Sequence, residues 1–289
     1  MTSLDPRRNA YRADLADRSL EGRVEAARFV EGVPRRISLP VAPVRRRPDA
    51  DAPLDTEALF GEAVVVFDDA AGWSWVQVAA GAAAYVGYVP SDALVPAAAP
   101  THRVCVPRTL VFPAPDIKRP PLSFLPMGAR VTVTGTAADH NAGYAQLLDG
   151  GFVVEQHLEP ADAVAPDFVA VAERFLGAPY LWGGKSVAGI DCSGLVQQAC
   201  AMAGVEAPRD TDMQERELGT RIAGIEALAR GDLVFWKGHV GIMLDGVRLL
   251  HANAHHMMTA VEPLSEAVAR IAARGSAVTG IRRILPPAA

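Results

Sequence analysis

A helical run that begins at a cysteine is the feature of this sequence that most constrains its fold. Apolar residues recur at helical spacing after Cys192, and the run ends at Gly204, a residue type favoured just past a helix C-terminus. In the first turn of a helix, unpaired backbone N–H groups and the positive end of the helix dipole both favour a thiolate over a thiol. Cys192 is therefore a candidate nucleophile. The apolar positions are Leu195, Val196, Ala199, Cys200, Met202 and Ala203.

Two strands further along the chain supply partners for this cysteine. A turn and strand over residues 231–236 precede a second strand that begins at His239, and alternation places His239 and Gly241 on one face of it. A third strand ends at His251, and an antiparallel hairpin through residues 245–246 would bring His251 near His239. Nucleophilic catalysis needs a base and a third group that orients the base. Cys192, His239 and His251 thus form a candidate triad.

From about residue 167 to the C-terminus, the sequence resembles the NlpC-type family of papain-like cysteine peptidases, which cut bacterial cell-wall peptides. The resemblance implies an α+β fold, with helices packed on an antiparallel sheet, for a catalytic domain over residues 166–289. It implies Cys192 as nucleophile, His239 as general base and acid, and His251 as the orienting residue. The matching motifs are Gly177-Ala178-Pro179-Tyr180-Leu181-Trp182-Gly183-Gly184, Asp191-Cys192-Ser193-Gly194, Pro208-Arg209-Asp210, Gly231-Asp232-Leu233-Val234-Phe235, Gly238-His239-Val240-Gly241 and His251-Ala252.

The remaining cysteines and histidines suggest neither a disulfide nor a metal site. Cys200 lies eight residues after Cys192. At about 1.5 Å per residue their Cα atoms are roughly 12 Å apart, too far for a disulfide, so we predict that Cys200 packs in the core. His255 and His256 are adjacent and would point to opposite faces of a strand, without a set of cysteine or carboxylate ligands. We therefore expect no metal, and the chemistry of the candidate triad needs no other cofactor.

Two stretches before the catalytic domain consist of short strands separated by Gly, Pro and Asp, in the same order in each stretch. They predict two small β-barrels, over residues 37–97 and 101–162, and each resembles a bacterial SH3-type domain. The first has the closing strand Gly87-Tyr88-Val89-Pro90. The second departs from the pattern, with Tyr144 where a tryptophan is usual and Gly151-Phe152-Val153-Val154 as its closing strand. A purely structural role is open for the second copy.

The first 36 residues predict a helical arm. Arginines alternate there with aspartates and glutamates, which suits a solvated helix face better than a basic patch. An amphipathic run indicates that the arm docks on another part of the protein. The apolar positions of this run are Leu15, Leu20, Val24, Ala27 and Val30.

Composition narrows the location and the partners. The chain has 289 residues and a net charge of −5, which argues against nucleic acid as a partner. No apolar stretch approaches the 18 to 20 residues of a membrane span, and the first residues lack the apolar region of a secretory signal. Three cysteines without evident partners agree with a reducing compartment. We therefore expect a cytoplasmic protein that does not enter the membrane, and the sequence leaves its oligomeric state open.

For the substrate, the resemblance implies a γ-D-glutamyl-L-diamino acid endopeptidase that acts on released cell-wall peptides (muropeptides) with a free N-terminal L-Ala. In that interpretation Asp191 and Glu62 bind the ammonium group of L-Ala, with the first SH3-type domain closing the donor side of the cleft. Ser193 would bond the α-carboxylate of the D-glutamyl residue. The Tyr180 hydroxyl and the nucleophile's own N–H would stabilise the oxyanion, and Arg209 would lie near the cleft.

Each of these assignments has a structural alternative. Asp191 also fits a helix N-cap, Glu62 a solvated turn, and Tyr180 a core aromatic, while Arg209 fits a structural role better than a substrate contact. At the level of the whole chain, two alternatives to a muropeptide peptidase remain. One is a secreted hydrolase that remodels the cell wall, and the other is a cell-wall or protein binding protein in which the peptidase fold is not catalytic.

Overall fold

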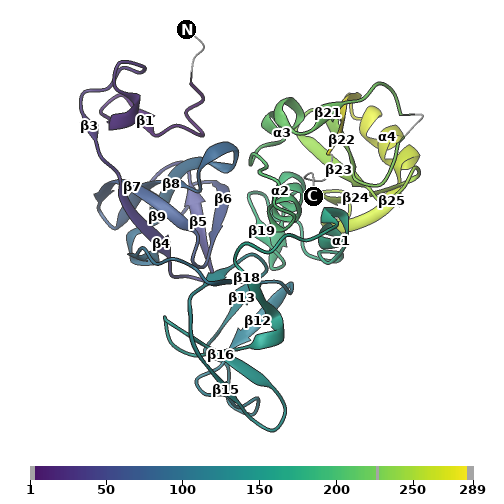
Figure 1. Cartoon of the computed structure of the whole chain (residues 1–289). Coiled ribbons are helices and arrows are strands. Elements are labelled where there is room, and N and C mark those ends of the chain that lie inside the picture. Colours follow the sequence, from purple (N-terminus) through teal and green to yellow (C-terminus); the bar gives the residue numbers. More distant parts are fainter. Residues whose placement is uncertain (1–3, 226–227, 285–289) are drawn as a thin grey trace. The chain divides into compact units, whose positions relative to one another are not determined.

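A computed structural model describes residues 4–225 and 228–284 (Figure 1). The chain divides into two compact units, Met1–Asp162 and Ala163–Ala289. Among the described residues, no helix is long and apolar enough to cross a membrane.

The arm is not helical, and this prediction for residues 1–36 is wrong over the described part, residues 4–36. An Asp17 carboxylate oxygen accepts a hydrogen bond from the Ser19 backbone N–H, and Gly22 has a φ of 76°, so the chain turns where a helix would continue. Charged side chains pair with near neighbours, as Arg12 does with Asp14 at 2.8 Å. The arm's elements are β1 (Tyr11–Arg12), β2 (Leu15–Asp17), η1 (Arg18–Leu20, a 3-10 turn) and β3 (Phe29–Val30).

Tertiary packing explains why the arm adopts this shape. Leu15 is fully buried and clusters with Phe67 and Trp75 of the sheet that follows. Arg12 lies 4.6 Å from the Trp75 ring centroid and donates to the Tyr88 hydroxyl at 2.9 Å. Two apolar residues of the predicted run, Leu15 and Val30, thus dock the arm on the sheet, but from strands instead of a helix, and Ala27 of the same run is exposed.

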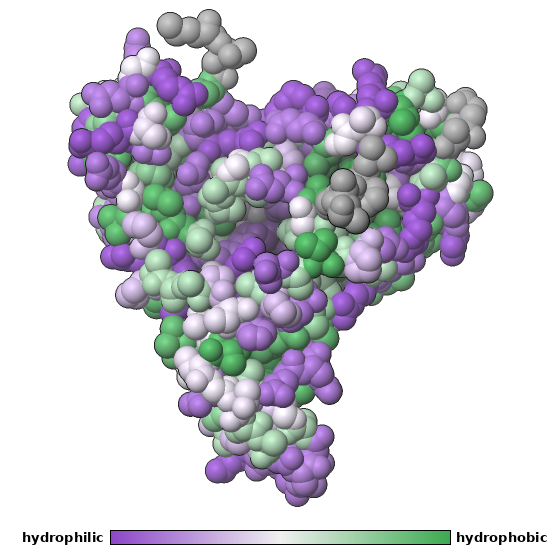
Figure 2. Space-filling view, viewed as in Figure 1, coloured by the Kyte–Doolittle hydropathy of each residue, from purple (hydrophilic) through white to green (hydrophobic). Residues whose placement is uncertain are grey.

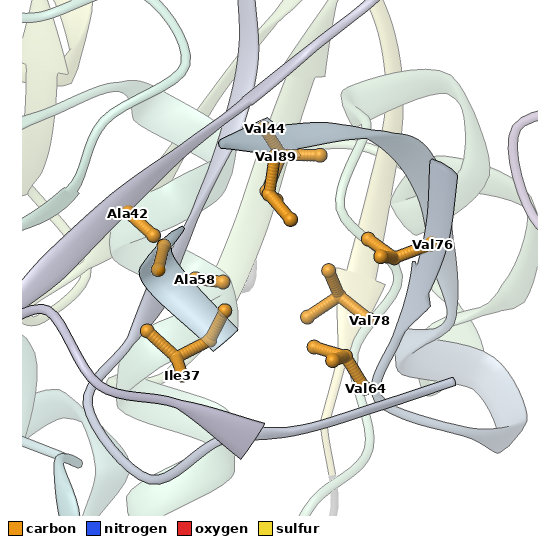
Figure 3. Packing of buried hydrophobic residues seen from close by; sticks show 9 residues of the cluster. Ile37, Ala42, Val44, Ala58, Val64, Val76, Val78 and Val89 are labelled. Carbon is orange, nitrogen blue, oxygen red and sulfur yellow. The ribbon is translucent and has the colours of Figure 1, made fainter. Parts of the chain in front are cut away.

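Residues 33–96 form a seven-stranded antiparallel sheet with the order β10-β4-β7-β8-β9-β5-β6. Its valines alternate along the strands, and those that face inward pack with Ile37 and Ala42 in a fully apolar core (Figure 3). β4 crosses the predicted boundary at residues 36 and 37, so the sheet begins earlier than expected, at Val33. The elements are β4 (Val33–Ile37), β5 (Val41–Arg45), β6 (Leu54–Leu59), β7 (Ala63–Ala70), β8 (Trp73–Val78), η2 (Gly81–Ala83), β9 (Tyr85–Pro90), η3 (Ser91–Ala93) and β10 (Leu94–Pro96).

Residues 101–162 contain three short antiparallel sheets, ordered β14-β11-β18, β12-β13 and β15-β16-β17. Their core includes Leu125 and Val153 together with Phe60 from the turn between β6 and β7. An ion pair of 2.6 Å between Arg36 and Asp149 also joins the two regions. The elements are β11 (His102–Val104), β12 (Arg108–Val111), β13 (Ser123–Pro126), β14 (Arg130–Val131), β15 (Val133–Ala138), β16 (Gly143–Leu147), β17 (Phe152–Val154), η4 (Glu155–His157) and β18 (Leu158–Pro160).

The second unit contains a six-stranded antiparallel sheet with the order β21-β26-β22-β23-β24-β25. Helix α2 contacts β23 and β24, and Cys200 of α2 is fully buried, as predicted. On the face drawn in Figure 2, hydrophobic residues form separate patches among hydrophilic ones. The elements are α1 (Phe168–Glu173), β19 (Lys185–Ser186), β20 (Gly189–Ile190), α2 (Cys192–Met202), α3 (Thr211–Glu217), β21 (Thr220–Arg221), β22 (Asp232–Trp236), β23 (His239–Met243), β24 (Arg248–Asn253), β25 (Met258–Pro263), α4 (Leu264–Ala272) and β26 (Val278–Arg283).

Candidate active site

The candidate nucleophile is the first residue of α2. Asp191 is the N-cap, and its carboxylate accepts a hydrogen bond from the Gly194 backbone N–H at 2.7 Å, so the N-cap alternative is confirmed. A Cβ at Gly194 would lie only 2.3 Å from the Gly184 carbonyl oxygen. Glycine at position 194 therefore lets the turn before the helix approach its first turn. In this packing the Cys192 side chain is buried, with 6% of the residue exposed.

A cluster of buried polar side chains, the turn cluster of Asp191, Ser193 and Arg209, surrounds the start of α2. Arg209 donates to both carboxylate oxygens of Asp191, at 2.9 and 2.7 Å, and to the Ser193 hydroxyl at 2.8 Å. The Gly183 backbone N–H donates to the same carboxylate at 2.8 Å. Only 2% of Arg209 is exposed. The structure thus brings three predicted substrate-binding residues together, with contacts that fix the shape of the loop.

Burial decides the protonation of the thiol. It raises the pKa of Cys192 to about 11, and the charge of Asp191 adds to the rise. The Val240 backbone N–H and the Thr211 hydroxyl, 3.9 Å from Sγ, oppose this rise. At neutral pH the resting group is therefore a thiol, although the sequence predicts that the helix start favours a thiolate. Thr211 is a neighbour of the nucleophile that the sequence did not reveal.

The two histidines meet across the β23–β24 hairpin, as its predicted geometry requires. His239 Nε2 lies 2.9 Å from His251 Nδ1. The register pairs Ile242 with Leu250, which places the two histidines diagonally on the same face of neighbouring strands. Burial lowers the pKa of His239 to about 3 and that of His251 to about 4, so both imidazoles are neutral at neutral pH.

Behind His251 lie two residues that the sequence analysis did not identify, Glu262 of β25 and Arg270 of α4. His251 Nε2 is 2.6 Å from Glu262 Oε1, and both Glu262 carboxylate oxygens accept hydrogen bonds from Arg270. Burial would raise the pKa of Glu262, but the hydrogen bonds from Arg270 and His251 lower it to about 2. Glu262 is a buried position of β25, where burial does not alternate along the strand, and a single charged residue in the run Met258–Pro263 is the signal that would have found it.

The other two predicted substrate residues lie apart in the sequence. Tyr180 pairs with Ile190, two residues before Cys192, in an isolated parallel β-bridge. Burial raises the pKa of the Tyr180 phenol, and the charge of a Cys192 thiolate adds to this rise. Tyr180 is therefore within electrostatic reach of the thiol. Glu62 belongs to the first unit, where its carboxylate accepts from the Leu59 backbone N–H at 2.9 Å and closes the turn between β6 and β7. This contact fits the turn alternative, and a substrate role for Glu62 stays a prediction.

Three side chains of the second unit have the chemistry of metal ligands. Potential ligand atoms of His251, His256 and Glu262 lie within 4.8 Å of one another. However, Glu262 already pairs with Arg270 through both oxygens, and His256 Nδ1 lies 3.0 Å from Asn253 Oδ1. A cation would have to displace the Arg270 guanidinium, so the donor set fits an ion pair better than a metal ion. That the protein needs no metal stays a prediction.

Residues 177–272 match the NlpC/P60 family, over the segment that holds Cys192, both histidines, Glu262 and Arg270. The chain contains an NlpC/P60 domain. Residues 44–94, within the first predicted barrel, match the bacterial dipeptidyl-peptidase SH3 domain. The predicted order of an SH3-type domain followed by an NlpC-type domain is confirmed.

Two relatives match the chain over most of its length. The chain is 28% identical over 239 residues to a γ-D-glutamyl-L-lysine dipeptidyl-peptidase of Bacillus cereus, covering 73% of this chain and 71% of the relative. It is also 28% identical over 228 residues to the protein of the same name in Bacillus subtilis, covering 70% and 73%. A crystal structure of an NlpC/P60 family protein from Bacillus cereus superposes with a TM-score of 0.72 at 22% identity, covering 88% of this chain and all of that one. The last likeness shows the fold.

Proposed function

We propose that this protein is a cysteine endopeptidase that hydrolyses the γ-D-glutamyl-L-diamino acid bond of cell-wall peptides. The observation that carries the proposal is Cys192 at the start of α2, in an NlpC/P60 domain where the ring nitrogens of His239 and His251 lie 2.9 Å apart. The names of the two Bacillus relatives, which this chain matches over both domains, supply the substrate class.

Attack begins from a neutral thiol and a neutral imidazole. Nε2 of His239 is committed to His251, so Nδ1 is the ring nitrogen that receives the Cys192 proton. As the proton leaves, sulfur bonds to the amide carbon and the carbonyl oxygen becomes an oxyanion. The backbone N–H of Cys192 and the Tyr180 hydroxyl are the proposed donors to that oxyanion, because the helix start leaves the first N–H groups without intrahelical partners.

Collapse of the tetrahedral intermediate breaks the C–N bond. Nδ1 of His239 returns its proton to the leaving amine, and a thioester remains on Cys192. Water then attacks the thioester carbon and gives a proton to the same nitrogen. The thiol leaves with that proton, which restores the neutral pair.

For recognition, we propose that Asp191 and Glu62 bind the ammonium group of a free N-terminal L-Ala, and that Ser193 bonds the D-glutamyl α-carboxylate. Asp191 is already compensated by Arg209, so its attraction for a second cation is weaker than that of an unpaired carboxylate. Arg209 contributes by holding the two neighbouring polar side chains in place.

The wider setting is also a proposal. A requirement for a free amine suits an enzyme that acts on released muropeptides during recycling in the cytoplasm, in agreement with three cysteines that form no disulfide within the described residues. We further propose that the three short sheets of residues 101–162 form a second SH3-like barrel, and that α2 and its neighbours cover the antiparallel sheet in a papain-like arrangement.

Mass spectrometry of peptide cleavage tests this function. The substrates are L-Ala-γ-D-Glu-meso-diaminopimelate, the same peptide with lysine in the last position, the N-acetylated form of each, and intact peptidoglycan sacculi. We expect cleavage of the free-amine peptides alone, and none by C192A. Equal cleavage of acetylated peptides or sacculi would overturn the free-amine clamp. No cleavage of any substrate, with retention of C192A on sacculi, would favour the binding-protein alternative.

A further inference from the structure

Four side chains form a continuous line through the second unit, here called the histidine relay: His239, His251, Glu262 and Arg270. The successive contacts are 2.9 Å from His239 Nε2 to His251 Nδ1 and 2.6 Å from His251 Nε2 to Glu262 Oε1, followed by the two-oxygen contact with Arg270. His251 is fully buried and Glu262 is 7% exposed. The relay joins three strands and one helix, β23, β24, β25 and α4.

The carboxylate fixes the proton on the histidine that it touches. A Glu262 carboxylate held by Arg270 through both oxygens is ionised and can only accept hydrogen bonds. A contact of 2.6 Å with His251 Nε2 therefore requires a proton on that nitrogen. With the proton on Nδ1 instead, two lone pairs would face each other at this distance.

The tautomer of His251 in turn sets the tautomer of His239. A neutral His251 with its proton on Nε2 has an acceptor at Nδ1, so His239 must donate through Nε2. Neutral His239 then has its lone pair at Nδ1, the atom that must take the Cys192 proton. In the opposite tautomer, His239 Nδ1 would carry a proton and would not act as a base.

We propose that Glu262, anchored by Arg270, is a positioning residue that sets the tautomer of both histidines and thereby makes His239 a base. This inference rests on the proposed function of Cys192 and His239. No proton moves to Glu262 in the reaction. The proton from sulfur shuttles on His239 Nδ1, and the N–H bonds at the Nε2 atoms of both histidines persist throughout. The charge of Glu262 meanwhile stabilises the imidazolium through the neutral ring between them.

Glu262→Gln is the first test, with Glu266→Gln as the matched control. Glu266 lies on α4, is exposed, and interacts with Arg270 only electrostatically. In either orientation, the amide N–H₂ of a glutamine faces an N–H of Arg270, and in one orientation it also faces His251 Nε2, which weakens the relay. We expect kcat of E262Q to fall on the order of 10- to 100-fold at an almost unchanged KM. This is less than the roughly 10⁴-fold loss seen when the group bonded directly to a catalytic histidine is neutralised. E266Q should retain the wild-type kcat.

The tautomers themselves give a readout that needs no substrate. Imidazole ¹⁵N–¹H correlation spectra of C192A, in which no thiol can protonate His239, should show protonated Nε2 and unprotonated Nδ1 in both His239 and His251 near pH 7. Adding E262Q to C192A should produce signal from the Nδ1-protonated form. A protonated Nδ1 in C192A itself would overturn the proposal, and so would an E262Q enzyme with full kcat.

This design separates the inference from the proposed function. If the wild type cleaves none of the peptides, the proposed function fails, yet the spectra of C192A still decide the tautomers. If the wild type cleaves while E262Q matches it, the relay fails alone. If E262Q does not fold, as judged by circular dichroism, the C192A spectra stand as the test, because that variant retains every member of the relay.

Discussion

Two arginine–carboxylate pairs flank the candidate site, and they do different work. Arg209 and Asp191 beside the nucleophile are almost completely buried, and Asp191 also accepts hydrogen bonds from the backbone N–H groups of Gly183 and Gly194. Behind the base, Arg270 is more exposed, with 21% of its side chain accessible, whereas its partner Glu262 is buried and contacts His251. The Asp191 carboxylate fixes the shape of a loop, and the Glu262 carboxylate fixes which nitrogen of His251 carries the proton. The same chemical pair thus fixes shape on one side of the site and tautomer on the other.

The largest expected effect comes from breaking the pair that holds shape. Arg209→Met leaves the Asp191 charge buried without its partner, and losses of this kind are about 3–5 kcal/mol in the free energy of unfolding. The matched control is Arg216→Met on α3, whose side chain is 56% exposed and forms ion pairs with Asp212 and Glu217. We expect a change within about 0.5 kcal/mol for R216M.

Urea unfolding of the full chain measures both R209M and R216M, and hydrogen exchange of α2 assigns the loss to the second unit. A broken buried ion pair should lower the stability of R209M by about 3–5 kcal/mol, so a loss below about 1 kcal/mol would mean that the turn cluster does not hold the loop.

A smaller effect should appear on acidification, because the two histidines beside the second pair are buried and neutral. The pKa values of His239 and His251 lie at about 3 and about 4 in the folded chain, below their ordinary value of 6.5. Below pH 6.5 the two histidines therefore bind protons in the unfolded chain but not in the folded chain. The free energy of unfolding is highest above pH 6.5 and decreases as the pH drops below this value. Together the two histidines should lower the free energy of unfolding by about 2 kcal/mol between roughly pH 6.5 and 5.5.

Hydrogen exchange of the second unit at these two pH values measures the loss. His251→Asn should reduce the change in the free energy of unfolding with pH, here called the slope, to roughly half, since one of two titrating groups is gone. His140→Gln, an exposed position in the first unit, should leave it unchanged. A wild-type slope near zero would show that the histidines are not held neutral by burial.

The sequence predicted the elements that depend on local pattern. Cys192 follows from a helical run with a capping aspartate, and the approach of His251 to His239 follows from strand alternation and a short hairpin. Glu262 was not predicted because its contact depends on the register of β24 with β25, which pairs Leu249 with Glu262. That register is set across a turn in which Met257 has a φ of 53°, and no local pattern encodes it.

The prediction of a helical arm was wrong for a related reason. Its apolar spacing fits a helix as well as it fits a set of short strands, and the choice is made by burial of Leu15 beside Trp75, far away in the sequence. Glu62 is different again, because its place in a turn follows from the sequence, whereas its role toward substrate stays a prediction. Local pattern therefore gave the candidate triad and the approach of its two histidines, and long-range packing determined the residues behind them.

The smallest expected effect concerns the thiol itself and tests whether the nucleophile side contributes chemistry as well as shape. Thr211→Val removes a hydroxyl 3.9 Å from Cys192 Sγ that favours the thiolate. A weak hydrogen bond of about 0.5–1 kcal/mol corresponds to roughly two- to fivefold less thiolate, so alkylation of Cys192 by iodoacetamide should slow by that factor at neutral pH. The matched control is Thr259→Val, since the buried Thr259 hydroxyl has no hydrogen-bond partner among residues 4–225 and 228–284. If T211V is alkylated at the wild-type rate, the residues around Cys192 fix the shape of the site and do not tune the thiol. If T259V is alkylated as slowly as T211V, the effect arises from packing and not from the Thr211 hydroxyl.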